Sequence, residues 1–330
     1  MKQHKLVFFI TLFVTGICFS VPALEIGLQG SLGNMAFDTN RDTTLGDANI
    51  PFKENLYWQG TATVEQAIAD NATFSILFNR DPILRNGLYT TIAYDTGYAK
   101  ITVGPFFGLF NSPSLMISSG LSTTLTMALP GLIYGTFRSD TTIGAGISVP
   151  GDYVQQQSKI ALGIWGPNTL TSFILSNKTL TYKKTASLTT VDSLTNYDWV
   201  TEVFKKNVPY TATVSLGYQS LKRAYIGGSI SSDELAAFMI GFDASFKLSD
   251  SFKLSGGGKA PLYAWGVGNL KSPGSTTILY EASLGMAIIV DTIRVPKRKA
   301  APAIEIPTDT PQESEGNGEA DPAIQDTIVN

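Results

Sequence analysis

The chain of 330 residues holds one histidine, His4, and one cysteine, Cys18. Both lie in the first 23 residues, so the remainder lacks the side chains that most nucleophilic triads and zinc or iron sites require. No disulfide can form there either, so stability must come from other interactions. Carboxylate or Ser-Lys chemistry would remain available, but no motif for either is present. We therefore expect no enzyme activity, no cofactor and no metal site.

Two polar segments resemble ligand loops without completing the pattern. Residues 38–42 place oxygen ligands at alternate positions, as a calcium loop does, but Thr43 stands where a turning glycine belongs and Asn49 where a bidentate glutamate is needed. Residues 256–258 are three consecutive glycines in a strand-like context with no helix following, which disfavours a phosphate loop. We expect these glycines to permit a bend or a close backbone approach.

The first 23 residues have the three-part order of an export signal. Lys2 and Lys5 precede an apolar run over residues 6–20, and small residues precede a cleavage site after Ala23. Cys18 follows the bulky Ile17, which disfavours lipid attachment. The chain is therefore predicted to be exported, with residues 1–23 removed as a signal peptide.

Charge is concentrated at the other end of the chain. The chain has 24 basic and 27 acidic residues, and residues 301–330 hold seven of the acids and no Lys or Arg. The segment 296–330 is rich in proline and lacks aromatics, so we expect a disordered acidic tail. The part before it is close to neutral, which gives no basic face for nucleic acid.

Alternation with a period of two dominates the part between these ends. No apolar run after the signal approaches the ~18 residues of a membrane helix. In residues 210–219, 238–248 and 278–290, apolar side chains occupy every second position and mostly small or polar ones the positions between. Such alternation places one side of a strand against an apolar medium and the other against water.

The same pattern, with turn residues between segments, predicts strands throughout residues 24–295. At roughly 20 residues for each strand and its connection, this length suits about 14 strands, with an even number from 12 to 16 accepted. The expected fold is all-β, an antiparallel transmembrane β-barrel. The strand segments are residues 24–32, 56–65, 72–80, 87–95, 98–109, 114–128, 131–138, 141–149, 153–165, 169–184, 198–206, 210–219, 222–231, 238–248, 251–266 and 278–290.

Three features favour a membrane barrel over a soluble β-sandwich. The strands reach about 13 residues, whereas globular strands have a mode of ~5–6. Charged residues make up only 15% of the chain, against a usual ~25%. Aromatic residues also lie on the apolar face near strand ends, where they would meet lipid headgroups. These aromatic residues are Tyr94, Tyr210, Tyr218, Phe238, Phe246 and Tyr280.

On this pattern the segment 24–295 resembles bacterial outer-membrane β-barrels of the porin-like type, and faintly the uncharacterised barrels of spirochaetes. The resemblance implies a passive channel for small polar solutes. It also implies outer-membrane lipid and the barrel-insertion machinery as partners, and leaves the oligomeric state open. The final strand lacks the terminal aromatic that such barrels usually carry.

Strand parity predicts which charges face the interior. In a water-filled pore these charges would set ion preference, and their mixed signs predict weak selectivity; alternatively, they could pair and brace or plug the barrel. The segment 186–197 is expected to be a long loop that could fold inward or face outside. The candidate lumen-facing charges are Glu25, Glu65, Lys100, Arg138, Lys159, Asp243, Lys247, Lys253 and Glu281.

Two other functions stay open at this point. One is an uptake barrel for hydrophobic molecules, similar to fatty-acid transporters, although alternation beginning at Leu24 leaves no room for the N-terminal plug those proteins carry. The other is a surface adhesin or structural barrel that acts through its loops and tail.

Overall fold

The computed structural model describes most of the segment in which strands are expected. The expected export signal, the segment 38–49 and the acidic tail lie outside the described residues. The described residues are 24–35, 56–111, 115–129, 131–143, 153–183, 186–204, 208–227, 231–268 and 279–290.

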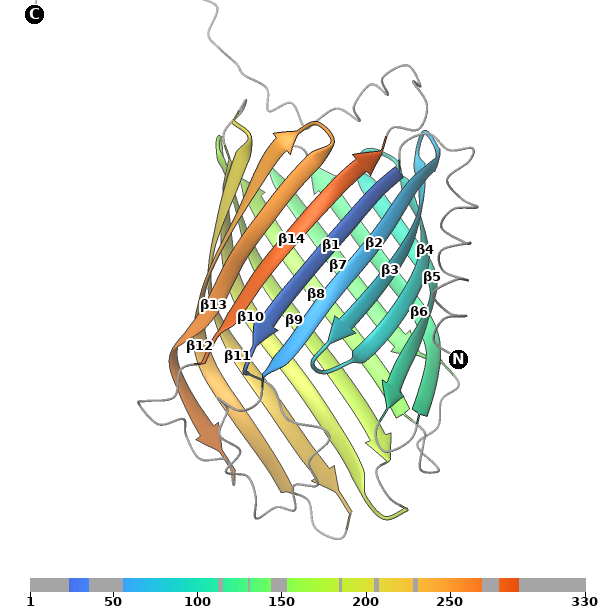
Figure 1. Cartoon of the computed structure of the whole chain (residues 1–330), viewed down its shortest axis with the longest axis vertical. Coiled ribbons are helices and arrows are strands. Elements are labelled where there is room, and N and C mark those ends of the chain that lie inside the picture. Colours follow the sequence, from blue (N-terminus) through green and yellow to red (C-terminus); the bar gives the residue numbers. More distant parts are fainter. Residues whose placement is uncertain are drawn as a thin grey trace, which may run out of the picture.

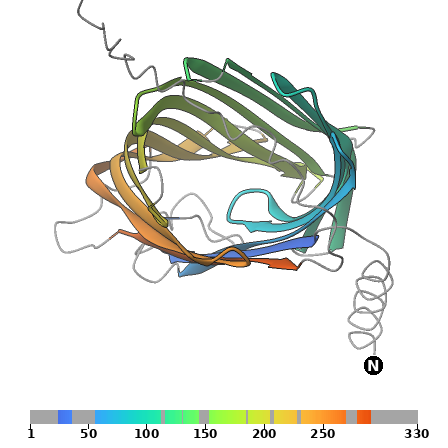
Figure 2. The same cartoon turned by 90° about the horizontal axis from the view of Figure 1, so that it is seen from above.

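Fourteen strands form one closed antiparallel sheet in which each strand pairs with its neighbours in the sequence. The barrel closes where β1 pairs with β14, from Leu24 opposite Val290 to Gly33 opposite Glu281 (Figures 1 and 2). The predicted all-β transmembrane barrel of about 14 strands is thus confirmed. The strands are β1 (Leu24–Gly33), β2 (Tyr57–Ala69), β3 (Ala72–Asp81), β4 (Arg85–Asp95), β5 (Ala99–Asn111), β6 (Leu115–Leu129), β7 (Ile133–Thr142), β8 (Tyr153–Trp165), β9 (Thr169–Lys183), β10 (Thr189–Phe204), β11 (Tyr210–Ile226), β12 (Ser231–Ser249), β13 (Phe252–Val267) and β14 (Glu281–Val290).

Two details of the predicted elements are wrong. Most of the segment 186–197 belongs to β10, because Thr189 to Phe204 pair continuously with β11. The segments 210–219 and 222–231 are not two strands separated at residues 220 and 221, because β11 runs unbroken from Tyr210 to Ile226. Of the strand predicted at 141–149, residues 141 and 142 belong to the end of β7, and residues 144–149 lie outside the described part.

Among the residues that the structure describes, no helix is long and apolar enough to cross a membrane.

The outer wall is a band of exposed apolar side chains. On β11, Tyr210, Val214 and Leu216 point outward, and each leaves about half of its surface exposed. The eight steps from Tyr210 to Tyr218, at about 3.4 Å each and a tilt of roughly 40°, give a height of roughly 21 Å, near the ~25 Å of an apolar membrane band. Aromatic rings mark both limits, with Tyr210 beside Phe246 and Tyr218 beside Phe238.

The wall reverses its polarity where β9 to β12 extend beyond this band. On the outer face, residues that pair across β9 to β12 form rows. The last apolar row is followed, two residues further along the same strands, by a row of small or polar residues. Leu175, Tyr197, Tyr218 and Phe238 form the first row, and Asn177, Thr195, Ser220 and Ala236 form the second. Beyond the second row the interior holds buried apolar side chains such as Leu221 and Leu235 together with the buried Asp192–Arg223 ion pair, and the outer face is mainly polar, as in the sheet of a soluble protein.

The two ends of the barrel differ in the length of their connections. Between β2 and β3, and likewise at every second connection, two to five residues join the strands. At the opposite end, where β9 to β12 extend, three connections are longer: 23 residues after β1, ten after β7 and 13 after β13. The first residue of β1 and the last residue of β14 both lie at the end of the barrel with the short turns, as an even number of strands requires (Figure 1).

Candidate functional site: a polar chamber and an inward turn

A cavity of about 640 Å³ lies inside the barrel. Amide, hydroxyl and charged side chains of both signs line it, and they come from β1 to β3 and from β7 to β14. This lining differs from the apolar packing that fills a soluble barrel, and it suits water and polar solutes. The polar side chains on the wall include Gln29, Ser31, Gln59, Asn79, Asp81, Arg138, Gln157, Lys178, Glu202, Asp243, Lys253, Lys259 and Glu281.

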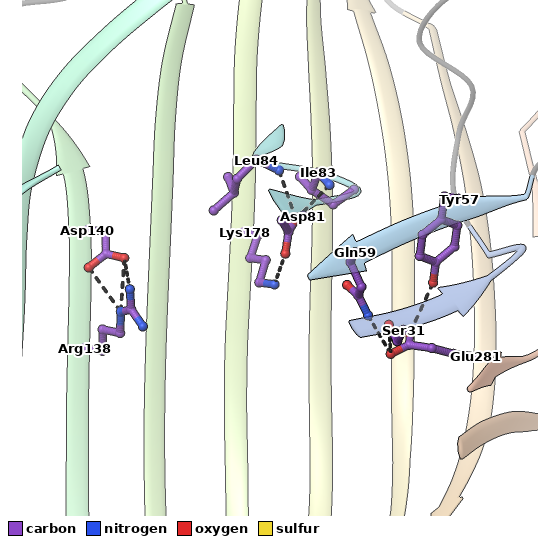
Figure 3. Close-up of polar contacts among 10 residues, drawn as sticks. All are labelled: Ser31, Tyr57, Gln59, Asp81, Ile83, Leu84, Arg138, Asp140, Lys178 and Glu281. Atoms are coloured by element: carbon purple, nitrogen blue, oxygen red, sulfur yellow. Dashed lines mark hydrogen bonds and ion pairs between the residues drawn. The ribbon is translucent and has the colours of Figure 1, made fainter. Parts of the chain in front are cut away.

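Glu281 gathers hydrogen bonds at the seam where the barrel closes. Its Oε1 accepts from Gln59 Nε2 at 2.6 Å and from Ser31 Oγ at 3.4 Å. Its Oε2 accepts from the Tyr57 hydroxyl at 3.1 Å. The donors lie on β1 and β2 and the carboxylate on β14, so one side chain ties three strands together from inside (Figure 3).

Arg138 and Asp140 form a second cluster on β7. The guanidinium donates from Nη2 to Asp140 Oδ2 at 2.7 Å, and Ser122 Oγ donates to Asp140 Oδ1 at 2.6 Å. Arg138 also lies over the ring of Tyr89, with its Cζ atom 5.4 Å from the ring centre. The carboxylate is buried and fully engaged, so this pair braces the wall (Figure 3).

The turn between β3 and β4 folds into the barrel (Figure 2). Asp81 Oδ1 accepts the backbone N–H groups of Ile83 and Leu84 at 2.8 and 3.0 Å, which fixes the shape of the turn. Asp81 also forms an ion pair with Lys178 on β9 (Figure 3). Strands β3 and β9 are six places apart in the ring, so this ion pair crosses the interior.

The first residue after the turn is held by a further charged group. Arg85 has φ 65°, a left-handed conformation that a non-glycine residue adopts only at a cost. Its Nη2 lies 3.8 Å from Asp192 Oδ2 on β10. Asp192 also accepts two hydrogen bonds from Arg223 on β11, at 2.6 and 2.8 Å, and is itself buried. The turn is therefore anchored to both β9 and β10.

An apolar cluster surrounds the turn at the end with the long connections. Ile83 and Leu84 are only 2% and 3% exposed. They pack with inward-facing residues of β6, β8, β9, β11 and β12, at the level where the outer wall has become polar. The other members are Met35, Met116, Tyr153, Leu180, Tyr182, Leu221, Leu235, Ala237, Met239 and Leu279.

The structure brings four of the nine candidate charges onto the chamber wall: Arg138, Asp243, Lys253 and Glu281. Lys159 lies opposite Arg138 in the register of β7 and β8. The remaining four lie toward the short-turn end of the barrel. Glu25 faces Glu65 across β1 and β2, Lys100 is the register partner of Asp95, and Lys247 is an exposed partner of Asp250 at 2.8 Å.

Sequence reasoning missed the residues that anchor the turn. Neither Asp81 nor Asp192 was among the candidate residues, and Asp192 lay in the segment predicted to be a loop. Strand parity could have pointed to Lys178, which lies on the same face of β9 as Leu180 and Tyr182, and to Asp140, two residues from Arg138. Of the three glycines at 256–258, Gly257 fits the predicted close approach, because a Cβ there would lie 2.5 Å from the Phe242 carbonyl oxygen.

Within the described part of the chain, no group of three or more His, Cys, Asp or Glu side chains is placed to hold a metal ion. The suspected calcium loop at 38–42 lies outside that part.

No family model matches the sequence, and no curated protein matches it. Solved structures that resemble the fold include an outer-membrane channel from Pseudomonas putida F1, at 8% identity over 82% of this chain and 97% of the other, with a TM-score of 0.45. A porin is 10% identical over 82% of this chain and all of its own, with a TM-score of 0.40. OmpT of Vibrio cholerae is 7% identical over 81% and 96%, with a TM-score of 0.37. Since these TM-scores lie below 0.5, the assignment of the fold rests on the closed sheet and apolar wall of this chain.

Proposed function

We propose that the protein is a bacterial outer-membrane channel through which small polar solutes diffuse. The observation that carries the proposal is the contrast across one sheet, with an apolar outer wall and a polar chamber of about 640 Å³ inside. A soluble barrel would have the opposite distribution. Charges of both signs line the chamber, which supports weak ion selectivity.

The proposed location follows from the wall and from the beginning of the chain. A closed barrel satisfies every backbone group within the lipid. The expected export signal, cleaved after Ala23, would bring the chain to the outer membrane, where the insertion machinery and lipid are its partners. Outer-membrane barrels have short periplasmic turns and longer external loops. These lengths support an orientation in which the end with connections of 23, 10 and 13 residues faces the outside of the cell.

The proposal includes no enzymatic step. Asp81, Asp140, Asp192 and Glu281 already have basic or hydrogen-bonding partners on other elements or within their own strand. These partnerships support roles in bracing the barrel and shaping its interior. The mixed polar surface beside them serves solute passage without covalent chemistry.

A second candidate, uptake of hydrophobic molecules, is favoured by one specific observation. The apolar cluster around Ile83 and Leu84 lies at the proposed external entrance, and its side chains, now packed against one another, would offer apolar surface to a solute if they moved apart. The chamber beneath it would then be a poor conduit, which is why the polar-solute channel is preferred. Saturable binding of a fluorescent fatty acid to the purified barrel would reverse this preference.

The test is conductance across a planar lipid bilayer. Purified full-length protein is expected to produce discrete current steps in KCl, with little preference between K⁺ and Cl⁻ because lumen charges of both signs are present. A protein incubated and added in the same way after heat unfolding is the control. Absence of steps at all salt concentrations and voltages would contradict the proposed channel.

A further inference from the structure

The β3–β4 turn contacts the opposite wall of the barrel because the end of β3 bends away from its own part of the sheet into the lumen. Fourteen strands about 4.8 Å apart and tilted by roughly 40° enclose a ring roughly 28 Å across. A lysine and an aspartate together span less than half of that. The contact between Asp81 and Lys178 therefore requires the end of β3 to bend across the lumen, as it does in Figure 2.

The turn is rigid within itself, and it meets the far wall through charged contacts and through the packing of Ile83 and Leu84 in the apolar cluster. The two hydrogen bonds from Ile83 and Leu84 to Asp81 are internal to the turn and would move with it. Its polar attachments to the opposite wall include the Asp81–Lys178 ion pair and the approach of Arg85 to Asp192. At the base of the turn, Arg85 holds a left-handed backbone conformation. A movement of the turn that let Arg85 adopt an ordinary conformation would relieve this strain.

We propose that the β3–β4 turn is the gate of the channel and that the Asp81–Lys178 ion pair is the latch that keeps it across the lumen. This inference rests on the proposed channel function. The latch is well suited to control the turn because both partners lie on the wall of the chamber. Without Lys178, the Asp81 carboxylate would be left buried without its cation. A movement of the turn that exposed this carboxylate to water would then lower the free energy.

The first test compares channels with and without the latch. Lys178→Met and Asp81→Asn should each raise the open probability or the unit conductance in a planar bilayer. The expected change in open probability is about tenfold, because losing one partner of a largely buried ion pair changes an equilibrium by at least that factor. Lys178→Arg preserves the pair and should behave as the parent protein. Lys222→Met removes a lysine from the outer face of β11 and should leave the current unchanged.

The second test reports on the turn without requiring conduction. In a Cys18→Ser background, Ile83→Cys provides a single thiol in the turn. It should react slowly with a water-soluble maleimide while the latch is intact and faster when Lys178→Met is added, whereas Lys222→Met should not alter the rate. Migration of unheated and heated samples on a detergent gel verifies that each variant is folded.

The outcomes separate the gate from the channel. Current steps in the parent protein, with neither conductance nor labelling altered by Lys178→Met, would overturn the latch and leave the channel standing. Faster labelling without current in any variant would support the latch and contradict the channel. Parent-like labelling in Lys178→Met overturns the latch whatever the currents show.

Discussion

Polar side chains inside this barrel are joined across strands. Glu281 accepts from donors on β1 and β2, and Asp192 holds Arg223 on β11 while lying near Arg85 on β4. Small residues make room for such groups. Asp243 extends over Gly257 on the next strand, where a Cβ would also lie 2.5 Å from the Phe242 carbonyl oxygen. An interior side chain such as Asp243 therefore fits because a glycine lies at the facing position on the next strand.

Two adjacent glycines on β13 allow this dependence to be measured. Gly257→Ala would meet the backbone of β12 and should lower the free energy of unfolding by about 1–3 kcal/mol, as overpacking does. Gly256→Ala faces outward, its nearest neighbour would be 3.5 Å away, and it should be neutral or stabilise by up to about 1 kcal/mol. Urea unfolding in lipid vesicles measures both. Equal losses in the two variants would show that Gly257 has no special packing role.

Individual strands carry two environments in sequence. On β11, outward residues from Tyr210 to Tyr218 are apolar, whereas Ser220 and Lys222 follow on the same face. Inward residues change in the opposite sense, from Thr211 and Thr213 on the chamber to Leu221 in the apolar cluster. One continuous strand therefore crosses from a lipid-facing wall to an extension that packs like a soluble sheet.

The position of that boundary predicts how arginine is tolerated along β11. Val214 faces outward midway between Tyr210 and Tyr218, and is 45% exposed to the surrounding medium. Val214→Arg should destabilise the barrel by about 2–4 kcal/mol, the cost of arginine near the bilayer midplane, and Ala224→Arg, beyond the boundary, by no more than about 1 kcal/mol. Unfolding free energies in vesicles provide the comparison, and similar losses at both sites would place the boundary elsewhere.

At the scale of the whole molecule, the fold was readable from the sequence because period-two alternation repeats in most of the strands. The number of strands followed from length alone. Pairing within long strands was less readable. The polar outer residues of β10 and β11 beyond the apolar band break the alternation, and so residues 186–197 were interpreted as a loop and β11 as two strands.

The interior was only half readable for a different reason. Parity alone led to Arg138, Asp243, Lys253 and Glu281, which line the chamber. The inward β3–β4 turn meets Lys178, which lies 97 residues away from Asp81 in the sequence. No local pattern encodes a contact of that range, because the closed ring creates it.

The central claim is that the chain forms a closed barrel seated in an outer membrane. The most direct measurement is gel migration in detergent, with and without heating, of the protein taken from the outer-membrane fraction of cells. A closed sheet without free edges should resist detergent until heated, so two distinct mobilities are expected from the membrane fraction. A protein released in soluble form by osmotic shock, with a single mobility, would contradict the account.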